Sequence, residues 1–508
     1  MKSFDGFQKN RNKAVIPALV AGTQSTLPRI ERPMGPGNKS RDDTSVYVSG
    51  RGSKSSPLFR AVVPLALTFA LAACTMAPDY ERPALDTPQG YASAQQPAGM
   101  DVAGDTQWWT AFGDPELTLL MQAALARNLD IEQALARVEQ ARGAARAAGA
   151  SLLPQVDGSG SATRSDTRGG PRRDSANLGL SASYAVDIWG RYRNEAKAAA
   201  LSLDATQYDK ESAALIVQSA VATTYFTILT LKDRIAIAED SLKAARDTLD
   251  IVEARYKVGT ISGLDLAQQR NTVATIDATL PPLRADLAAN GNALAILVAT
   301  TPGRFTVEGT TLDAVTLPAV AAGQPSALLE RRPDIKSAEA RLKAANADIG
   351  AARAAFFPSF DLSASLTRSF ATASAAETAT SLGASLLAPI FSGGTLEGNL
   401  QSAKGAQAEL AAAYKLVVLT SFSEVENALT DVEAAAAREA SLDIAAEEAG
   451  KTYTLSQARY RAGASDLLSV LDAQRSWLSS RDSAAQAQLD RYSSAVNLFV
   501  ALGGGWQN

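Results

Sequence analysis

The 508-residue sequence contains no histidine, a single cysteine and few aromatic side chains, which make up 6% of the chain. Without histidine the chain cannot build a Ser-His-Asp or Cys-His catalytic centre, and it lacks the commonest transition-metal ligand. One cysteine allows no disulfide within the chain. Asp/Glu or Ser/Lys chemistry stays open, but no compact motif for it occurs. The sequence therefore predicts a protein that is not an enzyme and that needs no cofactor.

The charge is divided unevenly along the chain. Residues 1–73 hold 11 of the 49 Lys and Arg residues but only 4 of the 53 Asp and Glu residues. The remaining 38 basic and 49 acidic residues give 74–508 a formal charge of −11. An acidic body argues against nucleic acid as a partner, because a phosphate backbone binds basic surfaces.

The N-terminal part of the chain looks like a leader. Its first 57 residues are polar and typical of disorder. Basic residues then precede an apolar run, Ala61–Ala73, which ends at Cys74 and is shorter than the roughly 20 residues that span a bilayer. A buried free thiol is the ordinary state of a lone cysteine. The Leu-Ala-Ala-Cys sequence, however, resembles a bacterial lipobox, so we expect 1–73 to be a disordered extension and lipoprotein signal peptide, with a lipid on Cys74. An extended arm over 74–107 follows.

The chain contains one pattern twice. Residues 129–163 and 333–367 align without gaps at a constant spacing. The matches hardest to attribute to alanine richness are Arg137 with Arg341, Pro154 with Pro358, Asp157 with Asp361 and Thr163 with Thr367. An Arg-Tyr-x-x-Gly sequence also recurs, ending at Gly259 and at Gly463. Two copies about two hundred residues apart indicate a duplicated half-protein and not a solenoid. We place the two structural repeats at 108–333 and 334–508.

Each repeat contains two segments with the alternation of a β-strand. The expected strands are 155–165, 177–188, 359–368 and 380–390, with loops between the members of each pair. Along 177–188, for example, apolar residues alternate with Gly, Ser, Ala and Asp. One apolar and one small polar face suit a transmembrane barrel, although a soluble antiparallel sheet with one wet face gives the same pattern.

Four strands cannot close a barrel, and open strand edges are not tolerated in lipid. If these strands lie in a membrane, several chains must share one barrel. Three chains give twelve strands, an even number within the range of known barrels. The trimer is thus a consequence of the membrane interpretation.

Long helices account for most of the rest. Residues 116–153 read as helical, with a break near Asn128 and an end at Pro154. Residues 191–258 contain no Pro or Gly, and a helix of that length extends roughly 100 Å at about 1.5 Å per residue. Its counterpart, 401–462, carries Gly450, which predicts an interruption.

The long helices need partners that return along them. Helices expected at 264–298 and 467–502 complete two hairpins with tips near Gly259 and Gly463, and Pro281-Pro282 should interrupt the first returning helix. Residues 300–333 form an equatorial segment, and we expect no helix in residues 300–326. The predicted fold class is an α+β membrane protein with long antiparallel coiled-coil helices and four strands per chain.

The chain resembles the outer membrane factor family, the TolC/OprM-type channels, and in particular the NodT-like efflux lipoproteins. The sequences that carry the resemblance, besides the lipobox, are Ala77–Pro83, Trp108-Trp109, Leu152–Pro154, Asp187–Gly190, Glu330–Ile335, Phe356–Ser359, Arg459–Gly463, Val470–Arg475 and Leu502–Trp506. The resemblance implies a homotrimer with a twelve-stranded barrel in the outer membrane and a twelve-helix tunnel through the periplasm. It also implies two partners, a periplasmic adaptor (membrane fusion protein) and an inner-membrane RND-type pump.

The resemblance further implies that Leu468, Asp472 and Arg475 narrow a closed periplasmic aperture, with Asp265 as the counterpart in the first repeat. Spacings of four and three place the first three on one helix face. Without the resemblance, Asp472 and Arg475 are better interpreted as a solvated surface pair worth under about 1 kcal/mol.

The same family docks its adaptor at the hairpin tips. Here those positions are Tyr256, Gly259, Tyr460 and Gly463. The two glycines are also suited to end helices, so they serve either role. Ser262-Gly263 is a departure from the family pattern that predicts a looser first tip.

The implied function is the trimeric outer-membrane channel of a tripartite efflux system, a passive duct that opens when its periplasmic hairpins splay. It would be lipid-anchored in the outer membrane and extend into the periplasm. The outer duct of a type I protein secretion system is the alternative within the same architecture. A periplasmic coiled-coil scaffold with a soluble sheet is the alternative from another class. No sequence feature identifies a cargo.

Overall fold

The computed structural model describes residues 76–93, 107–166, 168–169, 172–320, 324–371 and 374–504, all within the compact unit Ala66–Asn508. The elements are η1 (Trp108–Phe112), α2 (Pro115–Arg127), α3 (Leu129–Ala150), β1 (Gln155–Ser165), β2 (Arg173–Val186), α4 (Arg191–Lys257), α5 (Gly263–Asp277), α6 (Leu280–Leu297), η2 (Leu312–Ala314), α7 (Pro325–Arg331), α8 (Pro333–Ala354), β3 (Ser359–Ala371), β4 (Ser374–Leu387), α9 (Thr395–Arg461) and α10 (Leu467–Ala501). Cys74, the expected lipidation site, lies outside the described residues.

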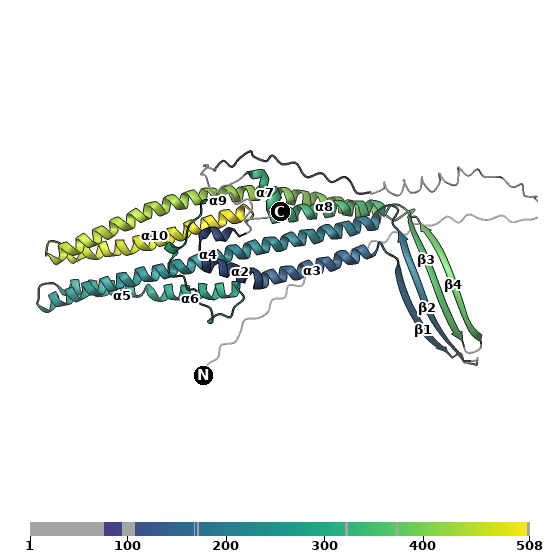
Figure 1. The fold of residues 1–508 in the computed structure, drawn as a ribbon, viewed down its shortest axis with the longest axis horizontal. Helices are drawn as coiled ribbons and strands as arrows, with labels where there is room; N and C mark the ends of the chain where they lie inside the picture. The colour runs from purple at the N-terminus through teal and green to yellow at the C-terminus, as the bar shows by residue number, and fades with distance from the viewer. Residues whose placement is uncertain are drawn as a thin grey trace, which may run out of the picture. The chain divides into compact units, whose positions relative to one another are not determined.

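The two repeats have the same order of elements: a helix, two strands, a long helix and a returning helix (Figure 1). The predicted break at Asn128 is confirmed, because its side-chain oxygen accepts hydrogen bonds from the backbone N–H groups of Asp130, at 2.8 Å, and Ile131. These bonds satisfy two of the free donors at the start of α3. The first returning helix also breaks as predicted, since α5 ends at Asp277 and α6 carries Pro281 and Pro282 in its first turn.

The long helices α4 and α9 have 67 residues each. The interruption predicted at Gly450 is wrong, since α9 is continuous across it. A Cβ at position 450 would lie 3.0 Å from the indole Nε1 of Trp477, which stacks on Tyr453 at 5.1 Å between ring centroids. Glycine at 450 therefore makes room for an aromatic side chain of α10 and does not end the helix.

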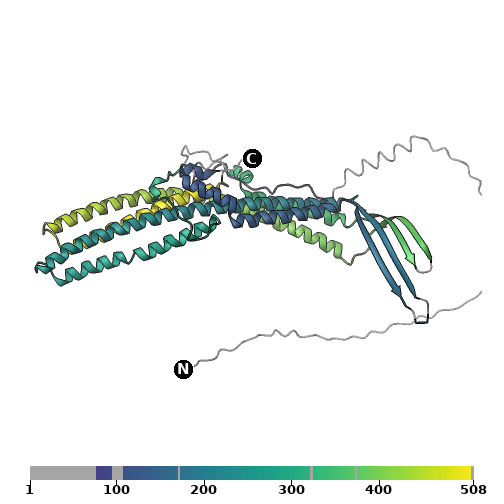
Figure 2. The same ribbon diagram turned by 60° about the horizontal axis from the view of Figure 1, so that its bottom comes forward.

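Helix α4 lies at the centre of the helical layer. It packs against α3 and α8 along the part near the strands, and against α5, α6 and α10 along the part near the tips (Figure 2). Helix α9 packs against α7, α8 and α10 and lies at one side, while α3, α5 and α6 lie at the other. One window of α4 is apolar enough to cross a membrane by composition, with a mean hydropathy of 1.6, but half of it is buried, as in a core helix.

The largest apolar cluster joins the ends of both repeats. Trp108 stacks on Phe499 at 5.1 Å between centroids, and Phe112 packs on Phe226 at the same distance. The equatorial segment covers this cluster. Its backbone is held by Lys232, whose Nζ donates to the carbonyl of Val307 at 2.6 Å. Among its described residues, the segment predicted to lack helix contains a short 3-10 turn, η2, and α7 begins at Pro325, just before the predicted boundary at 326.

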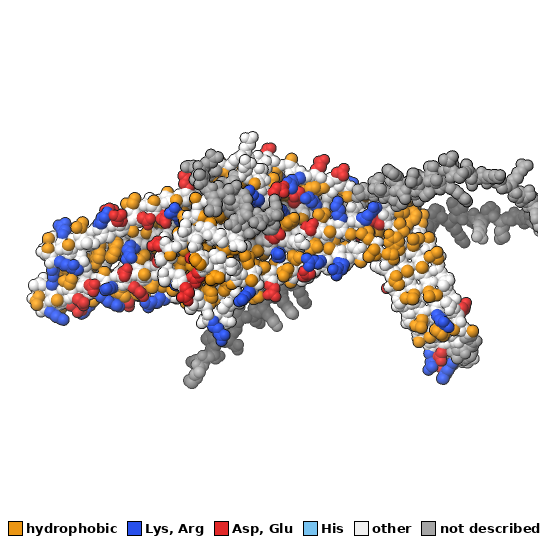
Figure 3. Space-filling model, in the orientation of Figure 1, with side chains coloured by type: hydrophobic (Ala, Val, Ile, Leu, Met, Phe, Trp, Pro, Cys, Tyr) orange, Lys and Arg blue, Asp and Glu red, His pale blue; other side chains and the backbone are white. Residues whose placement is uncertain are grey.

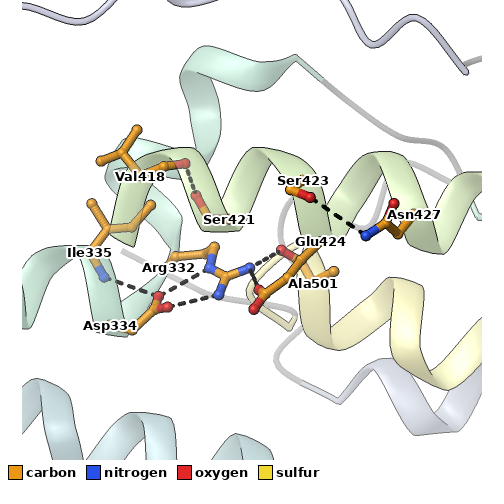
Figure 4. Close-up of polar contacts among 9 residues, drawn as sticks. All are labelled: Arg332, Asp334, Ile335, Val418, Ser421, Ser423, Glu424, Asn427 and Ala501. Atoms are coloured by element: carbon orange, nitrogen blue, oxygen red, sulfur yellow. Dashed lines mark hydrogen bonds and ion pairs between the residues drawn. The ribbon is translucent and has the colours of Figure 1, made fainter. Parts of the chain in front are cut away.

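A second junction is built around Arg332, which precedes α8 and is 8% exposed. Its guanidinium lies 2.7 Å from a carboxylate oxygen of Asp334 and 2.7 Å from one of Glu424, and donates to the carbonyl of Ala501 at 3.0 Å (Figure 4). One side chain thus connects the start of α8, the middle of α9 and the end of α10.

The four strands form one antiparallel sheet in the order β1-β2-β3-β4. The ends predicted for three strands are wrong: 177–188 is Arg173–Val186, 359–368 is Ser359–Ala371, and 380–390 is Ser374–Leu387. The polar residues assigned to loops continue the ladders. Asp174, for example, lies in β2 before the expected start at 177, where it faces Arg164 of β1 and forms an ion pair with it at 2.7 Å. Charge signalled a loop in the sequence, but a cross-strand pair neutralises it.

The described part of the arm, 76–93, lies along α8 and α9. Arg82 donates to both carboxylate oxygens of Glu339, at 3.0 and 2.9 Å. Burial alone would raise the pKa of Glu339, but the hydrogen bonds from Arg82 and Lys343 outweigh it and hold the pKa below its ordinary value. Further along, Glu426 accepts from the backbone N–H of Ala92 at 2.7 Å. The arm is therefore a docked strap on the second repeat.

We expect Gly350→Ala to loosen this strap. A Cβ at position 350 would lie 2.7 Å from the Cβ of Ala77, closer than real Cβ contacts, so the arm must move away. Limited proteolysis should then cut 76–93 several times faster. Gly405→Ala is the matched control, because it also adds a methyl group to a long helix but meets no atom within 4 Å in the chain. Equal protection of the arm in the two variants would contradict the docking.

Candidate functional site

The sheet has one apolar and one polar face. Because residues opposite each other in an antiparallel ladder share a face, the register places the apolar side chains of β2, β3 and β4 together. The members of this apolar face are Leu178, Leu180, Tyr184, Phe360, Leu362, Leu366, Leu382 and Leu386. Most of them are exposed in the single chain, and hydrophobic side chains are prominent over the strands in the space-filling view (Figure 3).

The opposite face carries small polar side chains. Ser181, Ser365 and Ser381 face one another across three strands, and the hydroxyl groups of the last two lie 2.8 Å apart. Asp157 lies in the same row, opposite Ser181, and Asp361 lies on the same face, opposite Ala185 and Ser385. Strands of 13 and 14 residues extend about 45 Å at roughly 3.3 Å per residue, which exceeds the apolar thickness of a bilayer.

Both edges of the sheet are open. Strand β1 pairs only with β2, and β4 pairs only with β3, among the residues that the structure describes. An isolated sheet with an exposed apolar face and two open edges is not stable in water or in lipid. The sheet therefore requires further strands, which this chain does not supply within its described part.

The other end of the helical layer is formed by the two hairpin tips. At each tip a glycine has a positive φ, 76° for Gly259 and 73° for Gly463, which favours glycine. The backbone N–H of Gly259 donates to Tyr256 and that of Thr260 to Arg255, the two bonds of a Schellman motif. Gly463 and Ala464 make the same two bonds in the second tip. The two tips are thus built alike.

Arg255 joins the first tip to the second. Its guanidinium carbon lies 4.6 Å from the ring centroid of Tyr460, and its Nη2 donates to the carbonyl of Arg461 at 3.1 Å. The carbonyl groups at the end of a helix lack partners in the helix itself, so an arginine from another helix stabilises them. Tyr460 is 4% exposed as a result, whereas its counterpart Tyr256 is 46% exposed.

The predicted aperture residues share one exposed stripe of α10. Leu468 is 50% exposed, although its neighbours Leu467 and Leu471 are buried in the cluster that holds the tips. Asp472 and Arg475 lie on the same stripe, with 3.3 Å between carboxylate and guanidinium. In the single chain both side chains are exposed to solvent, as expected for the solvated surface pair that the sequence alone suggests. The stripe gives one large apolar side chain and two opposite charges to whatever faces α10.

Asp265 is not brought to this stripe. Its carboxylate accepts from the backbone N–H of Ser262 at 3.0 Å, and the hydroxyl of Ser262 accepts from the backbone N–H of Asp265. This capping box closes the start of α5, so the loosening predicted from Ser262-Gly263 is wrong. In the second tip Asp466 has the same task, and hydrogen bonds from Ser469 lower the pKa of its carboxyl group.

Polar contacts at several levels hold the second hairpin on the first, among them an ion pair between Arg481 and Asp240 at 3.6 Å. Besides the Arg255 contact, Arg234 of α4 and Asp482 of α10 form a half-buried ion pair at 2.6 Å. The buried amide of Gln474 donates to the carbonyl of Ser241 at 3.4 Å. A movement that separates the hairpins must break these contacts, which lie at three levels along α4.

We expect the double variant Asp472→Ala/Arg475→Ala to raise the conductance of the protein in planar bilayers several-fold. If the stripe narrows an aperture, the change removes two long side chains and the ion pairs they make with neighbouring helices. Glu447→Ala/Lys451→Ala is the control, since it removes an exposed 2.7 Å pair on α9. Unchanged conductance would exclude Asp472 and Arg475 from the aperture.

Sequence reasoning missed two functional features. It placed Arg255 in a tip motif but gave it no task, since nothing in the sequence shows that it reaches the other tip. It also missed the Ser262–Asp265 capping box, for which the Ser-x-x-Asp pattern was a usable signal. Within the described ranges, no group of three or more Cys, Asp or Glu side chains is placed to hold a metal ion.

The comparisons with known proteins agree with this geometry. The family model described as outer membrane efflux protein matches the chain twice, at residues 120–300 and 324–504. The pyoverdine export outer membrane protein OpmQ of Pseudomonas aeruginosa is 39% identical over 81% of this chain and 90% of its own length. The cation efflux system protein CusC of Escherichia coli is 33% identical over 87% of this chain and 99% of its own. The open state of the outer membrane channel MtrE of Neisseria gonorrhoeae superposes with a TM-score of 0.77 at 30% identity, over 85% and 98% of the two chains.

Proposed function

The chain belongs to the outer membrane efflux protein family, whose members are transport channels, and we propose that three copies form one exit duct through the outer membrane. Twelve strands from three chains close a barrel of a size found in outer membranes. The barrel continues into a tunnel of long helices that ends at six hairpin tips. The duct itself is passive, and a pump elsewhere drives the transport.

One observation carries the proposal: the sheet is apolar on one face, small and polar on the other, and open at both edges. Lipid accommodates the apolar face only if every backbone N–H and C=O at the edges is paired. Closure with other copies satisfies both requirements at once. A soluble scaffold would leave the leucines of β4, among them Leu382 at 89% exposure, in water.

The repeat also defines how the edges meet. Strands β2 and β3, from different repeats, pair with Ser181 opposite Ser365. Their counterparts at the free edges are β4 of one copy and β1 of the next, because the helices that follow β2 and β4 begin at equivalent glycines, Gly190 and Gly394. If the same register is reused, Ser385 of one copy faces Ser161 of its neighbour. The apolar face of one copy then continues into that of the next copy, all the way around the barrel.

The hairpin tips and the N-terminal arm are the proposed attachment points for the partners and the membrane. The tips, with Tyr256, Gly259, Tyr460 and Gly463, are where we place a periplasmic adaptor that connects the duct to an inner-membrane pump of the RND type. Binding there favours the open arrangement by separating the hairpins, a shift in population that breaks the Arg234–Asp482 and Arg255–Tyr460 contacts. A lipid on Cys74 would hold the arm in the outer membrane.

Efflux is favoured over protein secretion because OpmQ is named for pyoverdine export and CusC for cation efflux. Neither cargo is assigned to this chain. Expression with candidate adaptor and pump pairs in a cell lacking its own efflux duct tests the assignment. Restored resistance to small toxic compounds supports efflux, whereas restored secretion of a protein with no effect on resistance would contradict it.

A further inference from the structure

The two tips are built alike but are not equally covered within one chain. Arg255, in the last turn of α4, covers the ring of Tyr460 and donates to the carbonyl groups of Tyr460 and Arg461 at the end of α9. The second tip of the chain is thereby closed by a residue of the first. This contact uses a planar, charged donor for which lysine is no substitute.

The repeat supplies the same residues a second time. Arg459, the counterpart of Arg255, is exposed in the last turn of α9, and its guanidinium makes no hydrogen bond or ion pair with a described residue. Tyr256, the counterpart of Tyr460, is half-exposed, and no arginine among the described residues lies over its ring. The carbonyl of Lys257, which corresponds to that of Arg461, accepts no hydrogen bond from a described residue. The guanidinium of Arg459 therefore lacks the acceptors that Arg255 has, and the first tip lacks the arginine donor that the second tip has.

We propose that Arg459 of one copy completes the first tip of the next copy, covering the neighbour's Tyr256 ring and donating to the neighbour's Tyr256 and Lys257 carbonyl groups. The proposal rests on the trimeric duct and names the contact that closes its tip ring. A head-to-tail interface that reuses an internal contact closes into a ring when the rotation allows it. Six tips would then be joined by two alternating kinds of link, Arg255 within a chain and Arg459 between chains.

The two links have different consequences. The Arg255 link holds the two hairpins of one chain together, while the Arg459 link alone joins neighbouring chains at this end. Separation of the two hairpins within a chain breaks the Arg255 link, and separation of neighbouring chains at this end breaks the Arg459 link. The Arg459 link therefore adds to the aperture stripe of α10 as a restraint on the closed state.

Photocrosslinking of the duct purified in detergent without adaptor tests the contact. Tyr256→p-benzoylphenylalanine places a photoreactive ring of similar shape at the acceptor. We expect light to produce a dimer band on a denaturing gel, with the adduct mapped to residues 455–463 of the other chain. The matched control is Tyr460→p-benzoylphenylalanine, which should react with residues 251–258 of its own chain and give no dimer band.

An adduct of position 256 with its own chain, or a dimer whose adduct lies outside 455–463, would overturn the proposal while an intact trimer on a semi-denaturing gel still supports the duct. Loss of the trimer in the unmodified protein would instead contradict the duct itself. As a second readout, Arg459→Met should raise the open-to-closed ratio in bilayer recordings about tenfold, as expected for losing a charge-assisted hydrogen bond. Arg459→Lys should restore little of it, and Arg461→Met, in the same turn, should leave the ratio unchanged.

Discussion

Leu382→Arg should remove the protein from the outer membrane, whereas Ser381→Arg, one residue away, should not. Leu382 lies in β4 on the apolar face and is 89% exposed in the single chain. An arginine on the lipid face near the bilayer midplane costs about 2–4 kcal/mol, and a trimer would carry three of them. We therefore expect little or no heat-sensitive trimer band in the membrane fraction of this variant.

The Ser381→Arg control separates the effect of the sheet face from the effect of the added charge. Ser381 points to the opposite side, where its hydroxyl lies 2.8 Å from that of Ser365. That face lines water in the proposed barrel, so Ser381→Arg should assemble normally and change only the conductance. Equal assembly of the two variants, or equal loss of both, would contradict the assignment of the apolar face to lipid.

Arg332→Ala should lower the thermal stability of the helical part by about 5 °C, corresponding to a loss of about 2–3 kcal/mol. The guanidinium is nearly buried and connects Asp334, Glu424 and the carbonyl of Ala501 (Figure 4). Its removal leaves the carbonyl without this donor and sets two carboxylates close together. The loss is smaller than for a fully buried pair, because both carboxylates are about half exposed and regain water.

Two variants separate the contacts from general damage. Arg331→Ala removes a neighbouring arginine whose side chain makes no hydrogen bond or ion pair with the described residues, and it should shift the melting temperature by less than about 1 °C. Arg332→Lys keeps the charge but not the planar fork and should fall in between. Melting is followed by circular dichroism in detergent. The same melting temperature for Arg331→Ala and Arg332→Ala would show that the junction does not stabilise the fold.

Features governed by regular patterns were accessible from the sequence. The long helices follow from stretches without Pro, the Asn128 break from a capping residue, and the faces of the sheet from strict alternation in 177–188. The wrong predictions arise where a residue's effect depends on a distant partner. Gly450 was interpreted as a helix breaker because its neighbour Trp477 is invisible in local sequence. The start of β2 was placed four residues too late, at 177, because Arg164 neutralises Asp174 only across the ladder.

The residues of the candidate site also fall into those that a local pattern predicts and those whose contacts depend on a distant partner. Leu468, Asp472 and Arg475 were predicted to share a helix face, and the structure places them on one exposed stripe of α10. Their part in an aperture stays a prediction, because the stripe faces outward in one chain. Arg255 could not be assigned from sequence, since its contact joins residues 205 and 206 positions apart. Because the chain is duplicated, the Arg255 contact also indicates a contact for its counterpart, Arg459.

The most direct test of the account is a cysteine pair at the two free sheet edges, Ser161→Cys/Ser385→Cys. Residues that face each other in an antiparallel ladder are close enough for a disulfide. We predict that the oxidised protein from outer membranes runs as a covalent trimer on a denaturing gel and returns to monomer on reduction. Ser161→Cys/Ala384→Cys, whose second side chain points to the other face, should stay monomeric. A monomer from the first pair under full oxidation, in a fraction that sediments with the outer membrane, would contradict a barrel shared between chains.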